Sequence, residues 1–248
     1  AMKKRCLTVV TLLALLLTAC TPGAPLSDTA PTTSPTVATD PTVSTDPPET
    51  QPTKPPEPEV IQITMSFTGD CTFGRNQKHT YANSFDQYYD KNGPDYFLEG
   101  VRSVFEQDDI TIINLEGPLT DSASGEQTKT FAFRGPTAYT QIMTGSSVEA
   151  VTLANNHAED FGKAGYESTT KALKDAGITY VEKNKTAMYT TESGLKIGLY
   201  AGAFDISTSD VKKDIATLRN NGAEIVICAF HWGEEGHYRP SEDQQKVA

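Results

Sequence analysis

Five residues that can bind metal ions or move protons stand at the ends of stretches that predict β-strands. They are Asp70, Glu116, Asn156, His157 and His231. In α/β folds, polar residues just past the carboxyl ends of the strands line the binding crevice. Because four separate predicted strands lead into such residues, we expect these side chains to meet at one edge of the sheets.

The chemistry of this set is that of a divalent-metal site. Carboxylate, carboxamide and imidazole groups suit Mn²⁺, Zn²⁺, Fe or Mg²⁺ better than copper or an iron–sulfur cluster. We predict metal ligands at Asp70, Glu116, Asn156 and His231. Two ions about 3.5–4 Å apart can clamp a phosphoryl group, so the site is expected to hold one ion or two. His157, next to a predicted ligand, is expected to act as a general acid.

Each of these residues also has a purely structural interpretation. Asp70 follows a glycine and could cap a turn. Glu116 precedes Gly-Pro and could be a solvated loop residue. Asn155 and Asn156 could be turn formers, and His231 could be a half-buried histidine. The functional interpretation is preferred because the structural one needs four coincidences at equivalent strand ends.

The elements that must position these residues alternate between strands and helices. Short β-branched or wholly apolar runs predict strands, and apolar residues at helical spacing predict helices. The expected strands are residues 60–68, 110–114, 148–153, 178–181, 195–201 and 225–230. The expected helices are residues 96–107, 137–144, 162–176 and 210–220, and Gly177 is expected to end the third of them as a left-handed cap. A further helix is expected to start at a Ser241–Gln244 capping box. This alternation indicates an α/β fold.

Ahead of the folded part lie two segments of different composition. Residues 1–19 resemble a signal peptide, with basic residues at 3–5 and an apolar run at 7–17 that is too short to span a membrane. The run ends in Leu-Thr-Ala-Cys, which resembles a lipobox, so we predict lipidation of Cys20. An ordinary signal peptide cut after Ala19 is the alternative. The predicted location is the cell membrane, lipid-anchored on the extracytoplasmic face.

Residues 20–58 carry the anchor and a predicted disordered stalk. Eleven of the 15 prolines lie between residues 22 and 58, among many Thr and Ser residues. Such a segment buries too little apolar surface to offset the entropy of ordering. The folded domain is therefore predicted to cover residues 59–248, and because the last predicted helix runs to Ala248, we expect the sequence to be part of a longer protein.

Charge and cysteine content limit the partners. The net charge is −11. Removal of the three basic residues at 3–5 leaves 18 basic against 32 acidic residues, a net charge of −14. An acidic chain without basic patches is unsuited to nucleic acid. Two cysteines remain in the folded part, Cys71 and Cys228, and they could be small buried residues or form one disulfide.

The ordered motifs around the candidate residues resemble those of the bacterial capsule-synthesis CapA family, also called the poly-γ-glutamate synthesis PgsA family. The resemblance covers roughly residues 60–248, and the motifs lie at residues 69–75, 114–120, 133–136, 153–158 and 231–233. This family is similar to the calcineurin-like metallophosphoesterases. The resemblance implies a two-sheet α/β sandwich flanked by helices and incomplete at the C-terminus.

The resemblance also implies roles. Asp70 matches the first-motif aspartate, Glu116 the second carboxylate, and His231 the later histidine. In the Asn-His motif, Asn156 would be a ligand and His157 the catalytic acid. The phosphoesterase first motif is Asp-x-His, whereas position 72 here is Thr, and the late Gly-His-x-His motif would lie beyond Ala248. We therefore expect this chain to bind metal weakly and to hydrolyse phosphoesters slowly.

Two arginines are candidates for binding an anionic group. Arg75 and Arg134 could grip a phosphate or carboxylate by bidentate hydrogen bonds. Surface ion pairs are the alternative role for both.

Two functions remain open from the sequence. The first is a metal-dependent hydrolase or transferase that acts on an envelope polymer or its phosphorylated precursor. The second is a non-catalytic component of a polymer-synthesis or export complex, with membrane polymer-synthesis proteins as partners. A sugar-binding lipoprotein is disfavoured because a single Trp offers few stacking platforms.

Overall fold

The computed structural model describes residues 60–79, 81–124 and 129–248. All of them belong to one compact unit, Pro58–Ala248. The predicted signal peptide, the lipidation site at Cys20 and the predicted stalk lie outside the described residues. In the part of the chain that is described, no helix has both the length and the apolar character needed to cross a membrane.

The first sheet has four parallel strands in the order β1-β3-β5-β6. Its strands are β1 Met65–Cys71, β3 Ile110–Leu115, β5 Ala150–Thr152 and β6 Thr179–Val181. Strand β3 is almost completely buried because both of its faces are covered. Ile110 and Ile112 pack toward the second sheet, whereas Ile113 and Leu115 pack on the opposite side. The wholly apolar sequence of β3 thus reflects a strand between two layers.

The second sheet has three strands in the order β7-β8-β9. They are β7 Lys185–Thr190, β8 Lys196–Ala203 and β9 Ile225–His231. β7 and β8 pair antiparallel, and β8 and β9 pair parallel. A small two-stranded antiparallel sheet, β2 Arg75–Asn76 and β4 Phe133–Arg134, lies apart from both.

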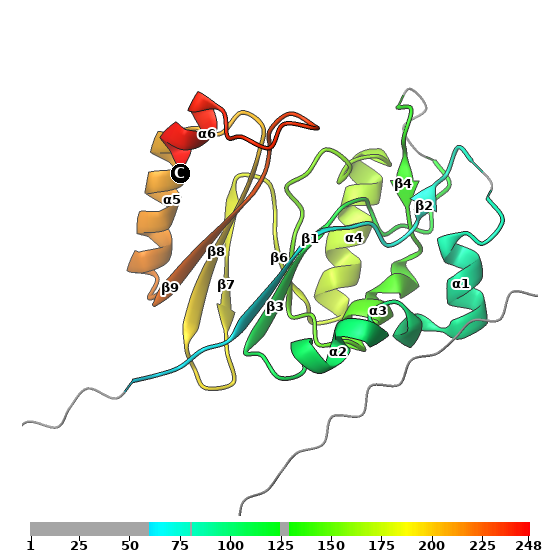
Figure 1. Cartoon of the computed structure of the whole chain (residues 1–248), viewed down its shortest axis with the longest axis horizontal. Coiled ribbons are helices and arrows are strands. Elements are labelled where there is room, and N and C mark those ends of the chain that lie inside the picture. Colours follow the sequence, from blue (N-terminus) through cyan, green and yellow to red (C-terminus); the bar gives the residue numbers. More distant parts are fainter. Residues whose placement is uncertain (1–59, 80, 125–128) are drawn as a thin grey trace, which may run out of the picture. The chain divides into compact units, whose positions relative to one another are not determined.

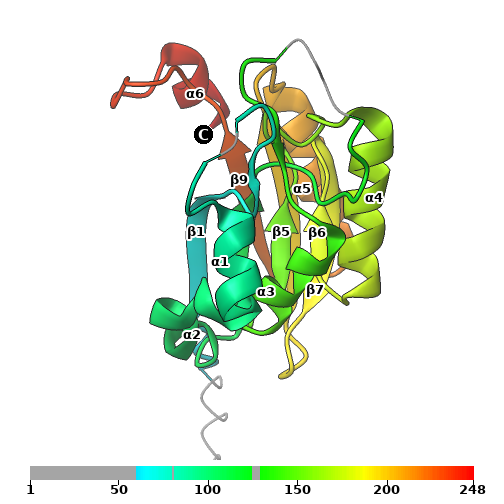
Figure 2. The same cartoon turned by 90° about the vertical axis from the view of Figure 1, so that its right-hand side faces the viewer.

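The two large sheets pack face to face, and helices cover their outer faces (Figure 1). The helices over the first sheet are α1 Phe85–Asn92, η1 Pro94–Tyr96, α2 Glu99–Phe105, η2 Thr137–Tyr139, α3 Thr140–Thr144 and α4 Gly162–Asp175. Those beside the second sheet are α5 Thr208–Asn220 and α6 Glu242–Val247. Figure 2 shows α1, α3 and α4 on the near side of the first sheet, with α5 behind it. The predicted two-sheet sandwich flanked by helices matches this α/β architecture.

Three apolar clusters hold these layers together. The cluster between the sheets includes Ile112, Ala150 and Ile197. The second cluster lies between the first sheet and its helices, and the third lies between the second sheet and α5. Each buried methylene contributes about 0.8 kcal/mol to the hydrophobic stabilisation. Because the three clusters bury many such groups, they hold the strands and therefore the strand ends in place.

Local sequence explains where α4 ends and where α6 begins. Gly177 follows the C-cap residue of α4, Ala176, and has a φ of 74°. The Ile178 N–H donates to the Leu173 carbonyl at 3.0 Å. This is a Schellman ending, and it requires a positive φ that glycine adopts without strain. The predicted glycine cap is therefore confirmed. The Ser241–Gln244 capping box at the start of α6 is confirmed as well.

The predicted strand at residues 60–68 is displaced. β1 begins at Met65 and ends at Cys71. Its pairing with β3 is interrupted by a register shift between Phe67 and Asp70 and then resumes, so that Asp70 and Cys71 still belong to the strand. The predicted helix at 96–107 is shorter, since η1 and α2 are separate. The sequence reading missed α1, β2, β4 and β7, which are short or polar and so give weak periodicity.

Candidate metal centre

Three candidate ligands come together from both large sheets. Asp70 lies in β1, Glu116 directly follows β3, and His231 ends β9. One ligand atom from each side chain can be chosen such that all three lie within 4.8 Å of one another. His231 Nδ1 is 3.3 Å from Asp70 Oδ1. These side chains are thus close enough together to share one divalent ion.

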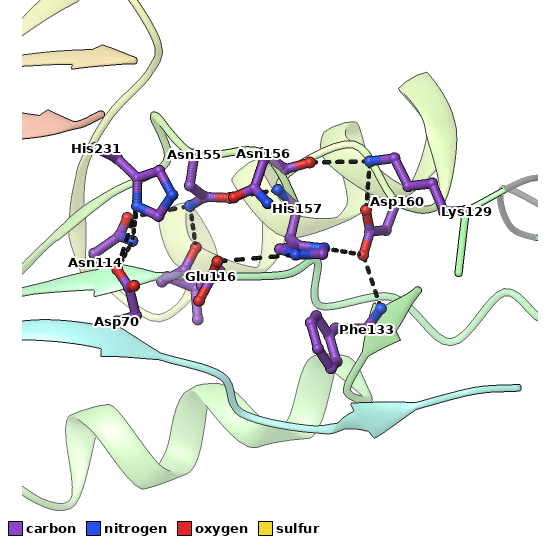
Figure 3. Close-up of polar contacts among 11 residues, drawn as sticks. Asp70, Asn114, Glu116, Lys129, Phe133, Asn155, Asn156, His157, Asp160 and His231 are labelled. Carbon is purple, nitrogen blue, oxygen red and sulfur yellow. Dashed lines mark hydrogen bonds and ion pairs between the residues drawn. The ribbon is translucent and has the colours of Figure 1, made fainter. Parts of the chain in front are cut away.

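Asn114 connects two of these ligands, as Figure 3 shows. Its side-chain amide donates to Asp70 Oδ1 at 2.6 Å and lies 3.3 Å from His231 Nδ1. Its carbonyl oxygen accepts from the Thr152 hydroxyl at 3.0 Å and from Asn155 Nδ2 at 3.1 Å. These two donors fix which end of the Asn114 amide faces the ligands. Sequence reasoning gave Asn114 no role, although it stands two residues before Glu116.

Glu116 is held at the end of β3 in a largely enclosed position. Its backbone N–H donates to the Cys71 carbonyl at 3.1 Å, and its side chain is 14% exposed. Burial raises the pKa of the Glu116 carboxyl, and the charge of Asp70 raises it further, while His157 and His231 act in the opposite direction. A nearby cation would favour the ionised form of this carboxyl.

The two adjacent asparagines have different surroundings. Asn155 is buried, and its side chain donates to the Leu115 carbonyl at 2.9 Å and accepts from the His157 N–H at 3.0 Å. Asn156, the predicted ligand, is exposed and lines the same cavity as Asp70 and Glu116. Asn155 therefore holds the loop in place, and Asn156 presents its side chain to the cavity region.

His157 is oriented by a carboxylate that the sequence analysis did not identify. Its Nδ1 lies 2.8 Å from Asp160 Oδ2, which also accepts the Phe133 N–H at 2.8 Å. Because Oδ2 acts as an acceptor, the His157 Nδ1 carries the proton. Nε2 therefore faces the ligands, 4.0 Å from Glu116 Oε1. The sequence signal that could have identified Asp160 is its position three residues after His157 on a tight loop.

Asp160 is completely buried and has a charged partner. The Lys129 ammonium lies 2.6 Å from Asp160 Oδ1 and also donates to the Asn156 carbonyl at 2.9 Å. A buried carboxylate without such partners would be strongly unfavourable. The Phe133 ring packs edge-on against His157, with centroids 4.6 Å apart (Figure 3). The orientation of the His157 ring is thus determined by Asp160 on one side and by Phe133 on another.

The five predicted site residues all line one cavity of about 430 Å³. The remaining lining residues are Phe204, Phe230, Trp232, Gly233, Glu234 and Glu235. In the described part of the chain, the lining contains four carboxylates and two imidazoles but no Lys or Arg. The donor set suits hard and borderline divalent cations, and the excess of carboxylates favours a cation in this place.

Arg75 and Arg134 lie on β2 and β4 and are not among the residues that line this cavity. Arg75 Nε forms an ion pair with Asp86 Oδ2 at 2.6 Å. Arg134 donates to the Ser122 carbonyl at 2.6 Å and stacks over the Phe161 ring. Both guanidinium groups thus have protein partners. The ion pair of Arg75 agrees with its alternative role, whereas the partners of Arg134 are neutral groups.

Cys71 and Cys228 are free thiols. Cys71 packs with the cluster under the helices of the first sheet, and Cys228 with the cluster beside α5. Because they lie on opposite sides of the sandwich, the single disulfide considered from the sequence is not formed.

Comparison with known proteins identifies the family. Residues 64–248 match the family described as Bacterial capsule synthesis protein PGA_cap. The chain belongs to this family. The match includes all five candidate site residues and the whole two-sheet sandwich, and it agrees with the resemblance carried by the strand-end motifs. Membership in the PGA_cap family supports a role in capsule synthesis.

Two curated relatives in bacilli are similar to this PGA_cap chain. The "Capsule biosynthesis protein CapA" of Bacillus anthracis is 25% identical over 215 residues, which cover 75% of this chain and 50% of the relative. The "PGA biosynthesis protein CapA" of Bacillus subtilis (strain 168) is 23% identical over 210 residues, which cover 75% of this chain and 53% of the relative. The chain thus spans about half the length of the curated relatives it matches.

Proposed function

We propose that this chain is a lipid-anchored, cell-surface protein of envelope-polymer synthesis or export, with a metal-dependent hydrolase site of the phosphoesterase type. The names of the curated relatives, which refer to capsule and PGA biosynthesis, point to poly-γ-glutamate or its precursor as the polymer. Membrane polymer-synthesis proteins are the expected partners. The lipid anchor follows from the motif at Cys20 alone.

One observation carries the hydrolase proposal. Asp70, Glu116 and His231 lie in or directly after three separate strands and offer ligand atoms within 4.8 Å of one another. The imidazole of His157 lies on the same cavity. The site combines two carboxylates with two histidines, and burial raises the pKa of one of the carboxyl groups, that of Glu116. An ion pair that served only stability would not need this combination.

A divalent cation held there would supply Lewis acidity to a phosphoryl oxygen of the substrate. Asp70 and Glu116 would neutralise its charge, and Asn114 would keep the Asp70 carboxylate and the His231 ring in place. His157 would bring a proton on Nε2 to the leaving oxygen, since its Nδ1 is already committed to Asp160. Asp160, paired with Lys129, would stabilise the imidazolium before that transfer.

The second candidate function is a non-catalytic component of the polymer-synthesis complex. Thr72 favours it, because the resemblance to metallophosphoesterases would place a histidine ligand at this position. A site with three side chains from His, Asp and Glu binds metal more weakly than one with a full set of ligands. The chain is therefore expected to bind metal weakly and to turn over slowly.

Metal binding and hydrolysis, measured on the same proteins, separate these functions. The full chain would be dialysed against Mn²⁺ or Zn²⁺, and the bound metal measured by mass spectrometry. We expect Asp70→Asn, Glu116→Gln and His231→Gln to lose the metal. The matched variants Asp175→Asn and His79→Gln, which change exposed residues away from the cavity, are expected to retain it.

Hydrolysis of bis(p-nitrophenyl) phosphate is then measured on the same proteins. Slow hydrolysis that His157→Ala abolishes without loss of metal would support the enzyme. Stoichiometric metal with no hydrolysis would favour the non-catalytic component. If the parent chain takes up no metal at all, the hydrolase proposal fails.

A further inference from the structure

Lys129 contacts the support of the candidate metal centre without lining its cavity. Its ammonium donates to the Asn156 carbonyl at 2.9 Å and lies 2.6 Å from Asp160 Oδ1 (Figure 3). Lys129 is not among the residues that line the 430 Å³ cavity. Any influence of this lysine on a bound ion must therefore pass through the residues that it contacts. One of them, Asn156, is a candidate ligand, and the other, Asp160, orients His157.

The ammonium of Lys129 is not needed to hold its own segment of chain. The backbone beside it is attached to β2 by other contacts. The Gln77 N–H donates to the Ala132 carbonyl at 2.9 Å, and the Ala132 N–H donates to Asn76 Oδ1 at 3.4 Å. The Lys129 side chain is 36% exposed and so fills no apolar core. What the ammonium holds is the loop on the far side of the contact, residues 156–160.

That loop has a second attachment, just ahead of Asn156. The Asn155 side chain donates to the Leu115 carbonyl at 2.9 Å and to Asn114 Oδ1 at 3.1 Å, and these bonds connect the loop to β3. Lys129 then holds the carbonyl of the next residue. A carbonyl fixed by a hydrogen bond restricts the ψ angle of its own residue. The contact from Lys129 therefore limits the directions in which the Asn156 side chain can point.

The chemistry of lysine suits this double contact. Its ammonium has three donors, so it can bond to a carboxylate and to a carbonyl at the same time. Hydrogen bonds with an ionised partner are shorter and stronger than neutral ones. Because Asp160 is completely buried, its carboxylate stays in one place and the ammonium with it. Lys129 thus fixes residues 156 and 160 relative to each other, across the turn that carries His157.

We propose that Lys129 is a positioning residue of the metal centre, whose ammonium holds Asn156 in the orientation that binds the cation. This proposal rests on the proposed function, since it requires Asn156 to act as a ligand of that cation. Outer contacts that orient metal ligands typically change metal affinity by about 10–100-fold when they are removed.

Metal affinity is the first test. Lys129→Met removes the ammonium and leaves a side chain of similar length. Calorimetric titration of the full chain with Mn²⁺ is expected to show binding that is about 10–100-fold weaker than in the parent chain. Lys163→Met, which changes an exposed lysine paired with Glu167 on α4, should bind Mn²⁺ as the parent does. Equal affinity of Lys129→Met and the parent overturns the proposal.

A double-mutant cycle shows whether the effect passes through Asn156. Asn156→Ala removes the candidate ligand and leaves the carbonyl that Lys129 contacts. In this background, Lys129→Met should weaken Mn²⁺ binding no further. A lysine that served only stability would lower the melting temperature in both backgrounds without this dependence. A further loss of affinity as large as that in the parent would contradict the positioning of Asn156.

A second variant guards against loss of the fold, because Lys129→Met leaves a buried carboxylate without its cation. Lys129→Met combined with Asp160→Asn removes both charges. This double variant is expected to fold, and to bind Mn²⁺ about 10–100-fold more weakly than Asp160→Asn alone. Equal affinity of the two proteins would mean that Lys129 only balances the charge of Asp160, and it would overturn the proposal.

Amide hydrogen exchange in EDTA tests the same contact without metal. Peptides that cover residues 154–161 should exchange at least about tenfold faster in the double variant than in Asp160→Asn, with β8 unchanged. If the parent chain takes up no metal, the hydrolase proposal fails, and unchanged exchange would then overturn the role of Lys129 as well. A parent that binds Mn²⁺ as tightly as its Lys129 variants refutes the positioning role and leaves the hydrolase standing.

Discussion

The Nδ1 of His157 lies 2.8 Å from Oδ2 of Asp160, a carboxylate that is completely buried. This contact determines which imidazole nitrogen faces the cavity. It also connects the candidate acid to Lys129 and to the backbone of β4. A catalytic role for His157 therefore depends on a residue that lies outside the cavity itself.

Asp160→Asn is expected to slow hydrolysis by about 10–100-fold while the chain retains its metal, because the amide no longer stabilises the imidazolium. The rate would be measured with bis(p-nitrophenyl) phosphate across pH 5–9. Asp175→Asn, an exposed residue paired with Lys171, serves as the control. An unchanged rate and pH profile in Asp160→Asn would argue against the positioning role.

Asn114→Ala is expected to weaken metal binding by about 10–100-fold, because Asp70 and His231 lose the amide that orients them. It should also destabilise the chain by about 1–3 kcal/mol, since the donors of Thr152 and Asn155 lose their acceptor. Calorimetric titration with Mn²⁺ and urea unfolding measure the two effects. Asn220→Ala, on the exposed face of α5, should change neither.

Glu116→Gln is expected to make the metal-free chain more stable at pH 7. The pKa of Glu116 is raised in the folded state, mainly by burial. Its contribution to stability is therefore fully present below the ordinary carboxyl pKa and is lost as the pH rises through the folded value. The glutamine side chain remains neutral, so it avoids that loss.

Unfolding of both proteins in EDTA from pH 3 to pH 8 tests this. The stability advantage of Glu116→Gln should shrink toward zero as the pH falls below the ordinary carboxyl pKa. Glu192→Gln, an exposed control, should show no such trend. An advantage that grows on acidification would contradict the assigned sign.

Gly135→Ala is expected to destabilise the chain by about 1–3 kcal/mol, because the new methyl would lie 2.2 Å from the Phe73 carbonyl oxygen. The affected β2–β4 pair carries Phe133, whose N–H donates to Asp160. Gly100→Ala in α2, where a Cβ meets nothing within 4 Å, should instead be neutral or stabilising by up to about 1 kcal/mol. Thermal unfolding followed by circular dichroism compares the two.

Cys20→Ser is expected to release the protein from the membrane fraction of the producing bacterium, because the lipid that the lipobox motif directs would have no acceptor. Cell fractionation and labelling with a radioactive or alkyne fatty acid measure this. Cys71→Ser, which changes a free thiol of the fold, should remain membrane-bound and labelled. Retention of Cys20→Ser at the membrane would point to another anchor.

The pattern of apolar runs was enough to predict the alternation of strands and helices, and the capping residues Ser241, Gln244 and Gly177 predicted the start of α6 and the end of α4. These features depend on neighbouring residues, which the sequence displays directly. The same runs placed Asp70, Glu116, Asn156, His157 and His231 at strand ends, and the parallel pairing of β1, β3 and β5 then brings most of them to one edge.

Only the tertiary structure decided which side chains support that edge. Asn114 contacts Asp70, which lies 44 residues away in the sequence. Asp160 contacts Phe133, 27 residues away, and Lys129, 31 residues away. No local pattern encodes such contacts. The positive φ of Phe204, 59°, likewise becomes visible only in three dimensions, because its sequence does not favour the left-handed region.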